Sequence, residues 1–292
     1  MIRRTELTCK TVVSPVHTYS LLSTSTLKSH GGVRFLHDAS TIYAIGDVHG
    51  RSDLLDQMVA YIHEDSRQRK CQPLVIFLGD IVDKGPDSCG AMNIVCDTVQ
   101  RWPGSQLMLG NHDYMFRDAI TVQRHDILKW LFQNGGHTTL ASYSRTLDFD
   151  PEEVLFDIPC SFPEHIRLLH DASMIQTVGQ YAFVHAGIDP AVPVSEQRLP
   201  DCIQIRSKFL DHVGRLSHVI VHGHTPLSPP RPVVTENRIS LDTHAWDTGV
   251  LSMAVFDLRR DTIEFFSTNE YGAVVPTQPL YLDRGFGTVC AD

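Results

Sequence analysis

The chain has 292 residues, 42% of them hydrophobic and 20% charged, which is ordinary for a soluble globular protein of one or two domains. Its formal net charge of -9 argues against general nucleic-acid binding, because such proteins usually present a basic face. No apolar run approaches the ~18 residues of a membrane-spanning helix, and seven scattered cysteines favour a reducing compartment, so we expect a cytoplasmic protein.

The first forty residues differ in composition from the rest of the chain. They are rich in Ser and Thr, and they contain more basic than acidic residues. The segment after Arg4 is polar, which argues against a secretory signal peptide, although the composition is compatible with an organelle transit peptide. We expect residues 1–40 to be a flexible extension and residues 41–292 to form one ordered domain.

A strand, loop and helix pattern occurs three times after residue 40. Apolar runs that predict buried strands end at glycines, and apolar residues at helical spacing follow. The predicted strands span 41–45, 74–78 and 106–109, and the predicted helices span 51–63 and 88–100 and begin again near residue 114. This alternation favours a mostly parallel sheet with right-handed crossovers.

The rest of the chain is helical at first and then rich in strands. A helix is predicted over 126–144, broken at Asn134-Gly135-Gly136, and another before Val178. Strands are predicted over 181–184, 218–221, 238–241, 251–258 and 262–267, the last two as a hairpin. These strands predict a second sheet packed on the first.

Polar clusters that contain glycine lie at the ends of the predicted strands. The clusters are GDVHG at 46–50, GDIVDKG at 79–85, GNHD at 110–113, VHAG at 184–187 and VHGH at 221–224. Each alone is compatible with a turn or a helix cap. However, Asp47 and Asp80 are 33 positions apart and Asp80 and Asn111 are 31 apart, close to one strand-helix-strand unit each. The clusters should therefore meet at the carboxyl ends of the strands, where such sheets bind ligands. Oxygen and imidazole donors from several strand ends suit two divalent metal ions, which indicates metal-assisted phosphoester hydrolysis.

With these motifs, residues 41–268 resemble the phosphoprotein phosphatase branch of the calcineurin-like metallophosphoesterases. The closest likeness is to the compact bacterial and bacteriophage members, which include the lambda phage phosphatase. The resemblance implies the metallophosphoesterase fold, an α/β fold built as a four-layer α/β/β/α sandwich of two mixed sheets. It also implies that residues 41–292 form the catalytic domain.

The resemblance assigns roles to individual positions. Asp47 and His49 would bind the first metal ion, Asp80 would bridge both ions, and Asn111, His185 and His224 would bind the second. A water held between the ions would attack phosphorus directly, without a phosphoenzyme. His112 would protonate the leaving oxygen and would be oriented by Asp83.

Cationic and polar groups are expected to bind the phosphate oxygens. The resemblance implies this role for Arg206, Lys84 and Asn111. Lys84 stands where the family usually has Arg, so the phosphate would be held less tightly in orientation there. Asp113 stands where most eukaryotic members have Glu, which leaves Asn111 intact.

Three further positions are open at this point. His244 replaces the glycine of a usual Asp-Thr-Gly and is either a tolerated loop residue or part of the substrate pocket. His222 would point to the same face as His224 in an extended strand, although the resemblance assigns the ligand role to His224. The glycine pair at 135–136 echoes one in the relatives, where it would break a helix beneath the pocket.

The sequence therefore predicts a metal-dependent phosphoric monoester hydrolase with two divalent ions, Mn, Fe or Zn, with Mn preferred. The expected activity is that of a protein serine/threonine phosphatase, with phosphotyrosine as an additional candidate substrate. Its expected substrates are phosphoproteins or phosphopeptides, and small aryl phosphates in vitro, with neither nucleic acid nor membrane as partner. One alternative is a symmetrical diadenosine tetraphosphate hydrolase, which shares GDVHG, GNHD and HAG. The other is a catalytically silent scaffold, against which the intact set of six ligands and His112 argues.

Overall fold

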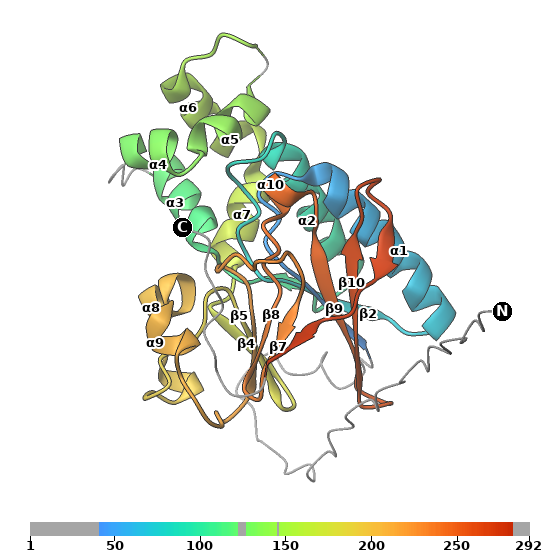
Figure 1. The fold of residues 1–292 in the computed structure, drawn as a ribbon. Helices are drawn as coiled ribbons and strands as arrows, with labels where there is room; N and C mark the ends of the chain where they lie inside the picture. Colours follow the sequence, from blue (N-terminus) through green and yellow to red (C-terminus); the bar gives the residue numbers. More distant parts are fainter. Residues whose placement is uncertain (1–40, 122–126, 145, 283–292) are drawn as a thin grey trace, which may run out of the picture.

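The computed structural model describes residues 41–121, 127–144 and 146–282. The flexible extension predicted for residues 1–40 lies outside the described residues, as do Cys9 and Cys290. Two six-stranded sheets pack face to face, with helices on their outer faces (Figure 1), so the predicted four-layer α/β/β/α sandwich is confirmed.

The first sheet has the strand order β11-β10-β9-β1-β2-β3. Its strands are β1 (Thr41–Ile45), β2 (Pro73–Phe77), β3 (Gln106–Leu107), β9 (Ser252–Asp257), β10 (Thr262–Thr268) and β11 (Val274–Pro276). Strands β1, β2 and β3 are parallel neighbours, whereas β9 pairs with β1 in the antiparallel direction and the pairs of β10 are antiparallel as well. The sheet is therefore mixed rather than mostly parallel.

The second sheet has the order β12-β7-β8-β6-β5-β4. Its strands are β4 (Ile175–Val178), β5 (Tyr181–Val184), β6 (Val219–His222), β7 (Val233–Val234), β8 (Arg238–Ser240) and β12 (Leu280–Tyr281). Within it, β5, β6 and β8 are parallel neighbours. Each sheet thus contains one group of three parallel strands.

The predicted hairpin at residues 251–267 exists, but it belongs to the first sheet and not to the second. Strands β9 and β10 pair in antiparallel register, and β9 continues the first sheet beside β1. All six residues of β9 are buried, because the second sheet covers one face of the strand and helices cover the other. A strand buried on both faces loses the alternation that would show which sheet it joins.

The helices form two outer layers and a lobe. They are α1 (Ser52–Arg69), α2 (Ser88–Arg101), α3 (Asn111–Ile120), α4 (Ile127–Gln133), α5 (Gly136–Tyr143), α6 (Pro151–Ser161), α7 (Pro163–Asp171), α8 (Leu199–Gln204), α9 (Ser207–Leu210) and α10 (Ala245–Thr248), with a 3-10 turn at Val194–Glu196. Helices α1 and α2 cover the first sheet, α8 and α9 cover the second, and α3 to α7 form a lobe beside the strand ends (Figure 1). The predicted break at residues 134–136 separates α4 from α5, and two helices, α6 and α7, precede Val178.

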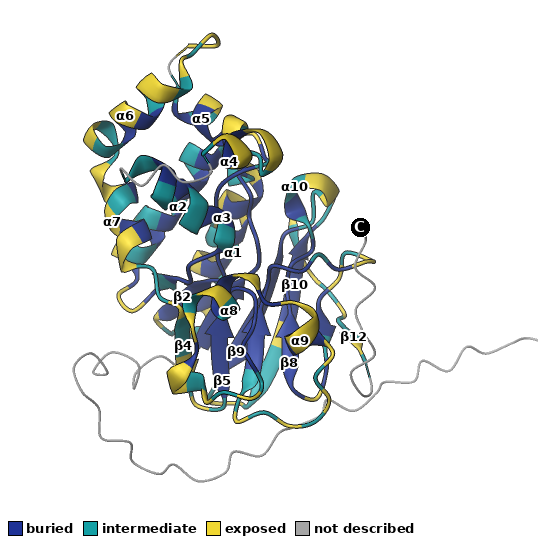
Figure 2. Ribbon diagram, turned by 90° about the vertical axis from the view of Figure 1, so that its left-hand side faces the viewer, coloured by how far each residue is buried: buried dark blue, intermediate teal, exposed yellow. Residues whose placement is uncertain are grey.

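Three apolar cores hold these layers together, and the strands of both sheets are the most buried part of the molecule (Figure 2). Between the sheets, Phe256 of β9 packs on Tyr181 and Phe183 of β5 with ring centroids 4.7 and 5.5 Å apart. Full burial of one such ring contributes roughly 1.5–3 kcal/mol. Close packing between the sheets fixes the two groups of parallel strands relative to each other, which positions the residues that follow them.

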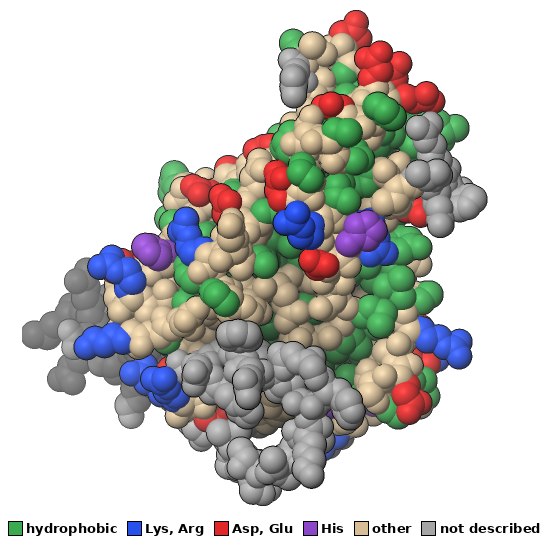
Figure 3. Space-filling model, turned by 180° about the vertical axis from the view of Figure 1, so that it is seen from behind, with side chains coloured by type: hydrophobic (Ala, Val, Ile, Leu, Met, Phe, Trp, Pro, Cys, Tyr) green, Lys and Arg blue, Asp and Glu red, His purple; other side chains and the backbone are tan. Residues whose placement is uncertain are grey.

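The surface of the lobe is acidic and partly apolar. Acidic side chains gather at its tip (Figure 3), where Asp150, Glu152, Glu153 and Asp157 surround the exposed ring of Phe156. Among residues 41–121, 127–144 and 146–282, none of the helices is long and apolar enough to cross a membrane.

Candidate active site

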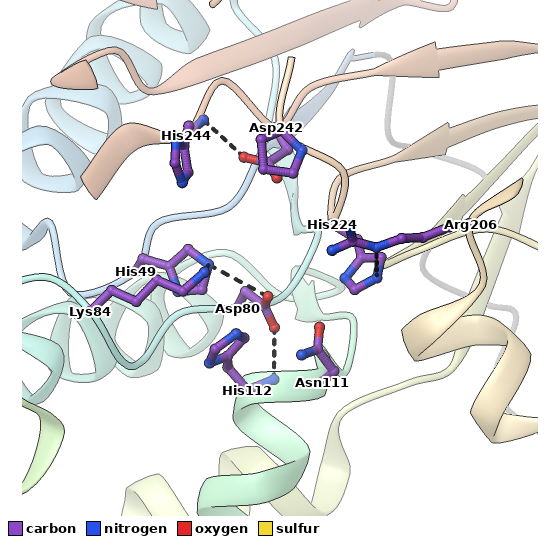
Figure 4. Close-up of a pocket in the computed structure, with 10 residues that line it drawn as sticks. His49, Asp80, Lys84, Asn111, His112, Arg206, His224, Asp242 and His244 are labelled. Atoms are coloured by element: carbon purple, nitrogen blue, oxygen red, sulfur yellow. Dashed lines mark hydrogen bonds and ion pairs between the residues drawn. The ribbon is translucent and has the colours of Figure 1, made fainter. Parts of the chain in front are cut away.

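Every predicted cluster lies directly after a strand of one of the two parallel groups. The first sheet supplies residues after β1 (Asp47, His49), β2 (Asp80, Asp83, Lys84) and β3 (Asn111, His112), and the second supplies residues after β5 (His185), β6 (His224) and β8 (Asp242, His244). Most of them line one cavity of about 60 Å³, together with Arg206 and Pro226 (Figure 4). Asp47, Asp83 and His185 are buried immediately behind its wall. The structure therefore brings all the predicted site residues together.

The backbone around this cavity is strained. Of the eight non-glycine residues described with positive φ, six belong to the site, namely His49, Asp80, Asp83, Lys84, His224 and His244. Such conformations cost on the order of 1–3 kcal/mol each and persist only where surrounding contacts hold them. Asp113 holds the backbone of Asp80 in this conformation, because its carboxylate accepts hydrogen bonds from the backbone N–H groups of Asp80 and Ile81 at 2.8 and 2.9 Å.

Glycine allows one close approach that the site requires. The backbone N–H of His224 donates to both carboxylate oxygens of Asp47, at 3.0 and 3.2 Å. A Cβ on Gly223 would overlap Asp47 Oδ1, so only glycine lets the two motifs meet. This contact joins the end of β1 to the end of β6 across the two sheets.

Three buried carboxylates converge, those of Asp47, Asp80 and Asp242, and within the described part of the chain none of them forms an ion pair with Lys or Arg. Burial and the carboxylate of Asp242 raise the pKa of Asp47 well above its usual value, and burial raises the pKa of Asp242. Burial alone would raise the pKa of Asp80 as well, but the imidazoles of His185, His112 and His49 hold it well below its usual range. Buried charges of one sign need a compensating charge, so this cluster is suited to cations.

Two imidazoles are oriented by backbone carbonyl groups. His49 Nδ1 lies 2.9 Å from the oxygen of Val82, and His185 Nδ1 lies 2.8 Å from the oxygen of Leu78. In both rings the other nitrogen, Nε2, faces Asp80, at 3.6 Å from Oδ2 for His49 and at 3.4 Å from Oδ1 for His185. A hydrogen bond on one ring nitrogen is the usual way to orient a metal-binding histidine.

These atoms form two groups with the geometry to hold a metal ion. One consists of His49, Asp80 and His112, and the other of Asp80, His185 and His224. Asp80 belongs to both, as a bridging carboxylate would. Asn111 extends the second group, because its Oδ1 lies 3.1 Å from His185 Nε2. The donor set of carboxylate, amide and imidazole suits Mn, Fe and Zn ions.

His112 differs from His49 and His185 because a carboxylate, rather than a backbone carbonyl, lies against its Nδ1. Its Nδ1 lies 2.7 Å from Asp83 Oδ2, which also accepts from Trp130 Nε1 at 2.9 Å, while Asp83 Oδ1 accepts from Thr139 Oγ1 at 2.6 Å. Burial raises the pKa of Asp83 although these three partners lower it. The pair faces the first group, since the rings of His49 and His112 are 4.7 Å apart.

Trp130, Thr139 and Asp113 were not predicted from the sequence as part of the site. Asp113 stands inside the GNHD motif at the third residue of α3, so its position next to Asn111 was an available signal. Trp130 and Thr139 come from α4 and α5 in the lobe and lie in no motif. Only the packing of the lobe against the loop after β2 shows that they hold Asp83.

Lys84 and Arg206, the two basic side chains that line the cavity, lie on different sides of it (Figure 4). Lys84 Nζ is 3.4 Å from His49 Nε2, and the backbone N–H of Lys84 donates to the oxygen of Gly135 at the break between α4 and α5. Arg206 is exposed and its Nε donates to His224 Nε2 at 3.3 Å. The glycine pair predicted to lie beneath the pocket is therefore found against Lys84.

His222 is a core residue. Strand β6 ends at His222, and the chain leaves the extended conformation before His224, whose φ is 65°. The ring of His222 lies 2.7 Å from Ser240 Oγ and packs against Phe209. The expectation that it shares a face with His224 is wrong, because the alternation of side chains holds only within a strand.

Comparison with known proteins agrees with this geometry. The model of the family described as calcineurin-like phosphoesterase matches residues 40–253. Serine/threonine-protein phosphatase 1 of Salmonella typhimurium is 26% identical over 220 residues, which cover 73% of this chain and 90% of that protein. The asymmetrical bis(5'-nucleosyl)-tetraphosphatase PrpE of Geobacillus thermodenitrificans is 28% identical over 238 residues, which cover 71% of this chain and 87% of that protein.

The fold also has a counterpart among solved structures. A cold-active protein-tyrosine phosphatase of a psychrophilic Shewanella species superposes with a TM-score of 0.50 and 14% identity, covering 82% of this chain and 81% of that one. At this identity the likeness concerns the fold alone.

Proposed function

The chain belongs to the calcineurin-like phosphoesterase family, and we propose that it is a protein serine/threonine phosphatase of the type found in small bacterial and bacteriophage members. The pair formed by His112 and Asp83 beside two potential metal groups is the observation on which the proposal rests. The chain would act on phosphoproteins, and its five described cysteines, all free, support a reducing cytoplasmic location.

Two divalent ions fit the acidic cluster, and Mn is our first candidate. Asp47 and His49 would bind one ion, Asn111, His185 and His224 the other, and Asp80 both. The two groups contain His49, Asp80, His185 and His224 of this set, Asn111 adjoins the second, and Asp47 lies outside both although its carboxylate accepts from the backbone of His224. When bound, such ions neutralise phosphate charge and make water a nucleophile at neutral pH. Burial alone would lower the pKa of His185, but Asp80 and Asp47 raise it to about 10. The two carboxylates therefore attract positive charge to this position.

His112 would donate a proton to the leaving oxygen from Nε2, since Nδ1 contacts Asp83. Asp83 stabilises the protonated ring and fixes its orientation, and Trp130 and Thr139 in turn fix Asp83. The alkoxide released from phosphoserine is a strong base that must take up a proton as it leaves. A positioned acid is thus most useful for the substrate that we propose.

The phosphate would lie between the two cationic side chains. Arg206 supplies a planar guanidinium that can bind two phosphate oxygens, whereas Lys84 supplies a point charge. Asn111 has an amide beside the second group and would contribute an additional polar contact. Because Arg206 is exposed, it can move from His224 to a bound phosphate.

Hydrolysis of a dinucleoside tetraphosphate is the second candidate, favoured by the similarity to the Geobacillus enzyme. The net charge of -9 offers no broad attraction for a polyphosphate chain, which favours a monoester over the dinucleotide. A scaffold without activity is the third reading, which the complete set of converging side chains opposes.

One experiment separates these candidates. The full chain, depleted of metal and reloaded with Mn, is assayed side by side on phosphoserine and phosphotyrosine peptides, p-nitrophenyl phosphate and diadenosine tetraphosphate. We expect higher kcat/KM for the monoesters and loss of activity on chelation. A preference for the dinucleotide would overturn the protein-phosphatase proposal, with two ADP indicating symmetrical and ATP plus AMP asymmetrical cleavage. Full activity in metal-free protein would overturn the proposed metal chemistry.

A further inference from the structure

His244 has a backbone conformation that glycine adopts most easily. Its φ is 60° and its ψ is 47°, in the left-handed region, immediately before α10. Histidine tolerates this region better than most residues, but glycine occupies it without a steric cost. The chain nevertheless has an imidazole here, and that imidazole lines the cavity (Figure 4). A side chain at this position thus reaches the substrate pocket where glycine would leave it open.

The surroundings of His244 form an aromatic and cationic wall. Its ring meets the ring of Trp246 edge to face, with centroids 4.9 Å apart at 85°. Lys84 Nζ lies 5.8 Å from the centroid of Trp246, and His244 Nδ1 lies 3.8 Å from Asp247 Oδ2. The side chain of His244 is 30% exposed, so a ligand can touch it. The wall is fixed from behind because Arg51 donates to the oxygen of Ala245 at 3.0 Å.

We propose that His244, backed by Trp246, determines specificity by contacting the group esterified to the phosphate and favouring an aromatic group over an alkyl group. The inference rests on the proposed monoesterase function, and it extends the substrates proposed above from phosphoserine and phosphothreonine to phosphotyrosine, for which this wall would raise kcat/KM. An imidazole held edge-on by an indole can stack against a phenyl ring, whereas the short chain of phosphoserine offers it little surface. His244 is thus a substrate-binding residue, and phosphotyrosine is the physiological ester that it would favour.

Distance decides between an aryl group and a nucleobase. His244 lines the same small cavity as His49, Asp80 and His112, so it lies next to the reacting phosphate. In an aryl phosphate one oxygen separates phosphorus from the ring. In a dinucleoside tetraphosphate a ribose, and in symmetrical cleavage a further phosphate as well, separates the attacked phosphorus from the nearer base. The wall therefore lies nearer to the position of an aryl ring esterified to the phosphate than to that of adenine.

The test measures selectivity. In the Mn-loaded full chain, His244→Gly and His244→Asn remove the ring while suiting the left-handed backbone. We expect the ratio of kcat/KM for phosphotyrosine over phosphoserine peptides of one sequence to fall about 2- to 10-fold in both variants, the range of one aromatic contact. Asp261→Gly is the control, because Asp261 also has a positive φ, 52°, but lies in the turn between β9 and β10. An unchanged ratio in both His244 variants, or an equal fall in the control, would overturn the inference.

Binding separates this inference from the proposed function. Calorimetry with phenylphosphonate and methylphosphonate reports on the wall without turnover. We expect wild-type protein to bind the phenyl compound more tightly and both His244 variants to lose about 2- to 10-fold of that preference. If the protein cleaves only dinucleotides while this preference behaves as expected, the proposed function fails and the role of His244 stands. Equal affinities of the wild type for the two compounds would overturn the role of His244, whatever substrate is cleaved.

Discussion

The two groups of parallel strands supply opposite walls of one pocket, and they differ in how firmly they hold their side chains. On the first wall, buried hydrogen-bond partners fix the orientation of the imidazoles. The backbone oxygen of Val82 contacts Nδ1 of His49, and the carboxylate of Asp83 contacts Nδ1 of His112. On the second wall, Arg206 is exposed and His244 is 30% exposed. His185 of the second wall is buried, and the residue that fixes its ring is Leu78, whose backbone oxygen follows strand β2 of the first sheet. The first wall is therefore organised for chemistry, whereas the second combines two buried metal-ligand candidates, His185 and His224, with more exposed side chains that can contact substrate.

The supporting layers explain this difference. The loop after β2 packs against the helical lobe, whose α4 and α5 contribute Trp130 and Thr139 to Asp83. Behind the second wall, α8 and α9 have six and four residues, and their apolar side chains pack on the sheet. A wall supported on two sides keeps strained loops in place. We therefore expect substitutions of His112 and its partners on the first wall to lower kcat, and substitutions of the exposed residues Arg206 and His244 on the second to change KM or selectivity.

The largest effect should come from Asp80, which joins the two walls. Asp80→Asn removes the charge that faces both His49 and His185, while Asn tolerates the left-handed backbone. We expect loss of both ions by elemental analysis and loss of measurable activity. His222→Ala is the comparison, since His222 is bonded to Ser240 away from the pocket and should keep metal and turnover. Equal losses in the two variants would show that the ligand set is misplaced.

His112→Asn should lower kcat by about 10²- to 10⁴-fold, the usual contribution of a general acid. Its metal content should be retained, because the six proposed ligands, Asp47, His49, Asp80, Asn111, His185 and His224, are unchanged. The loss should be smaller for p-nitrophenyl phosphate than for a phosphoserine peptide, since nitrophenolate leaves without a proton. The same defect with both substrates would argue that His112 binds metal, as its place beside His49 and Asp80 also permits.

The convergence of the polar motifs at one edge could be predicted from the sequence for a physical reason. Metal chemistry needs particular donor atoms at strand ends, so Asp47, Asp80 and Asn111 stand in short local motifs. The partners of Asp83 could not be predicted, because Trp130 and Thr139 are 47 and 56 positions away and any packed helix can contain them. The place of β9 beside β1 was missed likewise, since residues about two hundred positions apart pair there and local patterns do not record which strands become neighbours.

Trp130→Phe tests whether the lobe contributes to catalysis through Asp83. The variant keeps an aromatic ring beside Phe116 but removes the N–H that donates to Asp83 at 2.9 Å. We expect kcat to fall about 10-fold with KM and metal content unchanged, as for other residues that orient a catalytic group. Trp102→Phe is the matched control, because Trp102 is buried at the end of α2 beside His63. If both variants lose activity equally, the defect comes from packing.

The smallest effect should come from Arg206→Lys on the second wall. The variant keeps the charge but replaces a planar fork by a point charge, so one of two hydrogen bonds to phosphate is lost. One such bond contributes about 1 kcal/mol, so we expect KM for a phosphopeptide and the inhibition constant of inorganic phosphate to rise about 5-fold, with kcat nearly unchanged.

The neighbouring Lys208 provides the control for this last prediction. Lys208 lies on α9, which begins directly after Arg206, and its Nζ pairs with Asp189 Oδ2 at 2.6 Å. Lys208→Ala should therefore leave the KM for the phosphopeptide and the inhibition constant of phosphate unchanged. The converse variant, Lys84→Arg, adds a fork on the first wall and should lower the inhibition constant of phosphate. A fall in kcat with unchanged KM in Arg206→Lys would place Arg206 with His112 among the groups that act in the transition state. The claim that the exposed residues of the second wall act on substrate binding, and those of the first wall on turnover, would then be wrong.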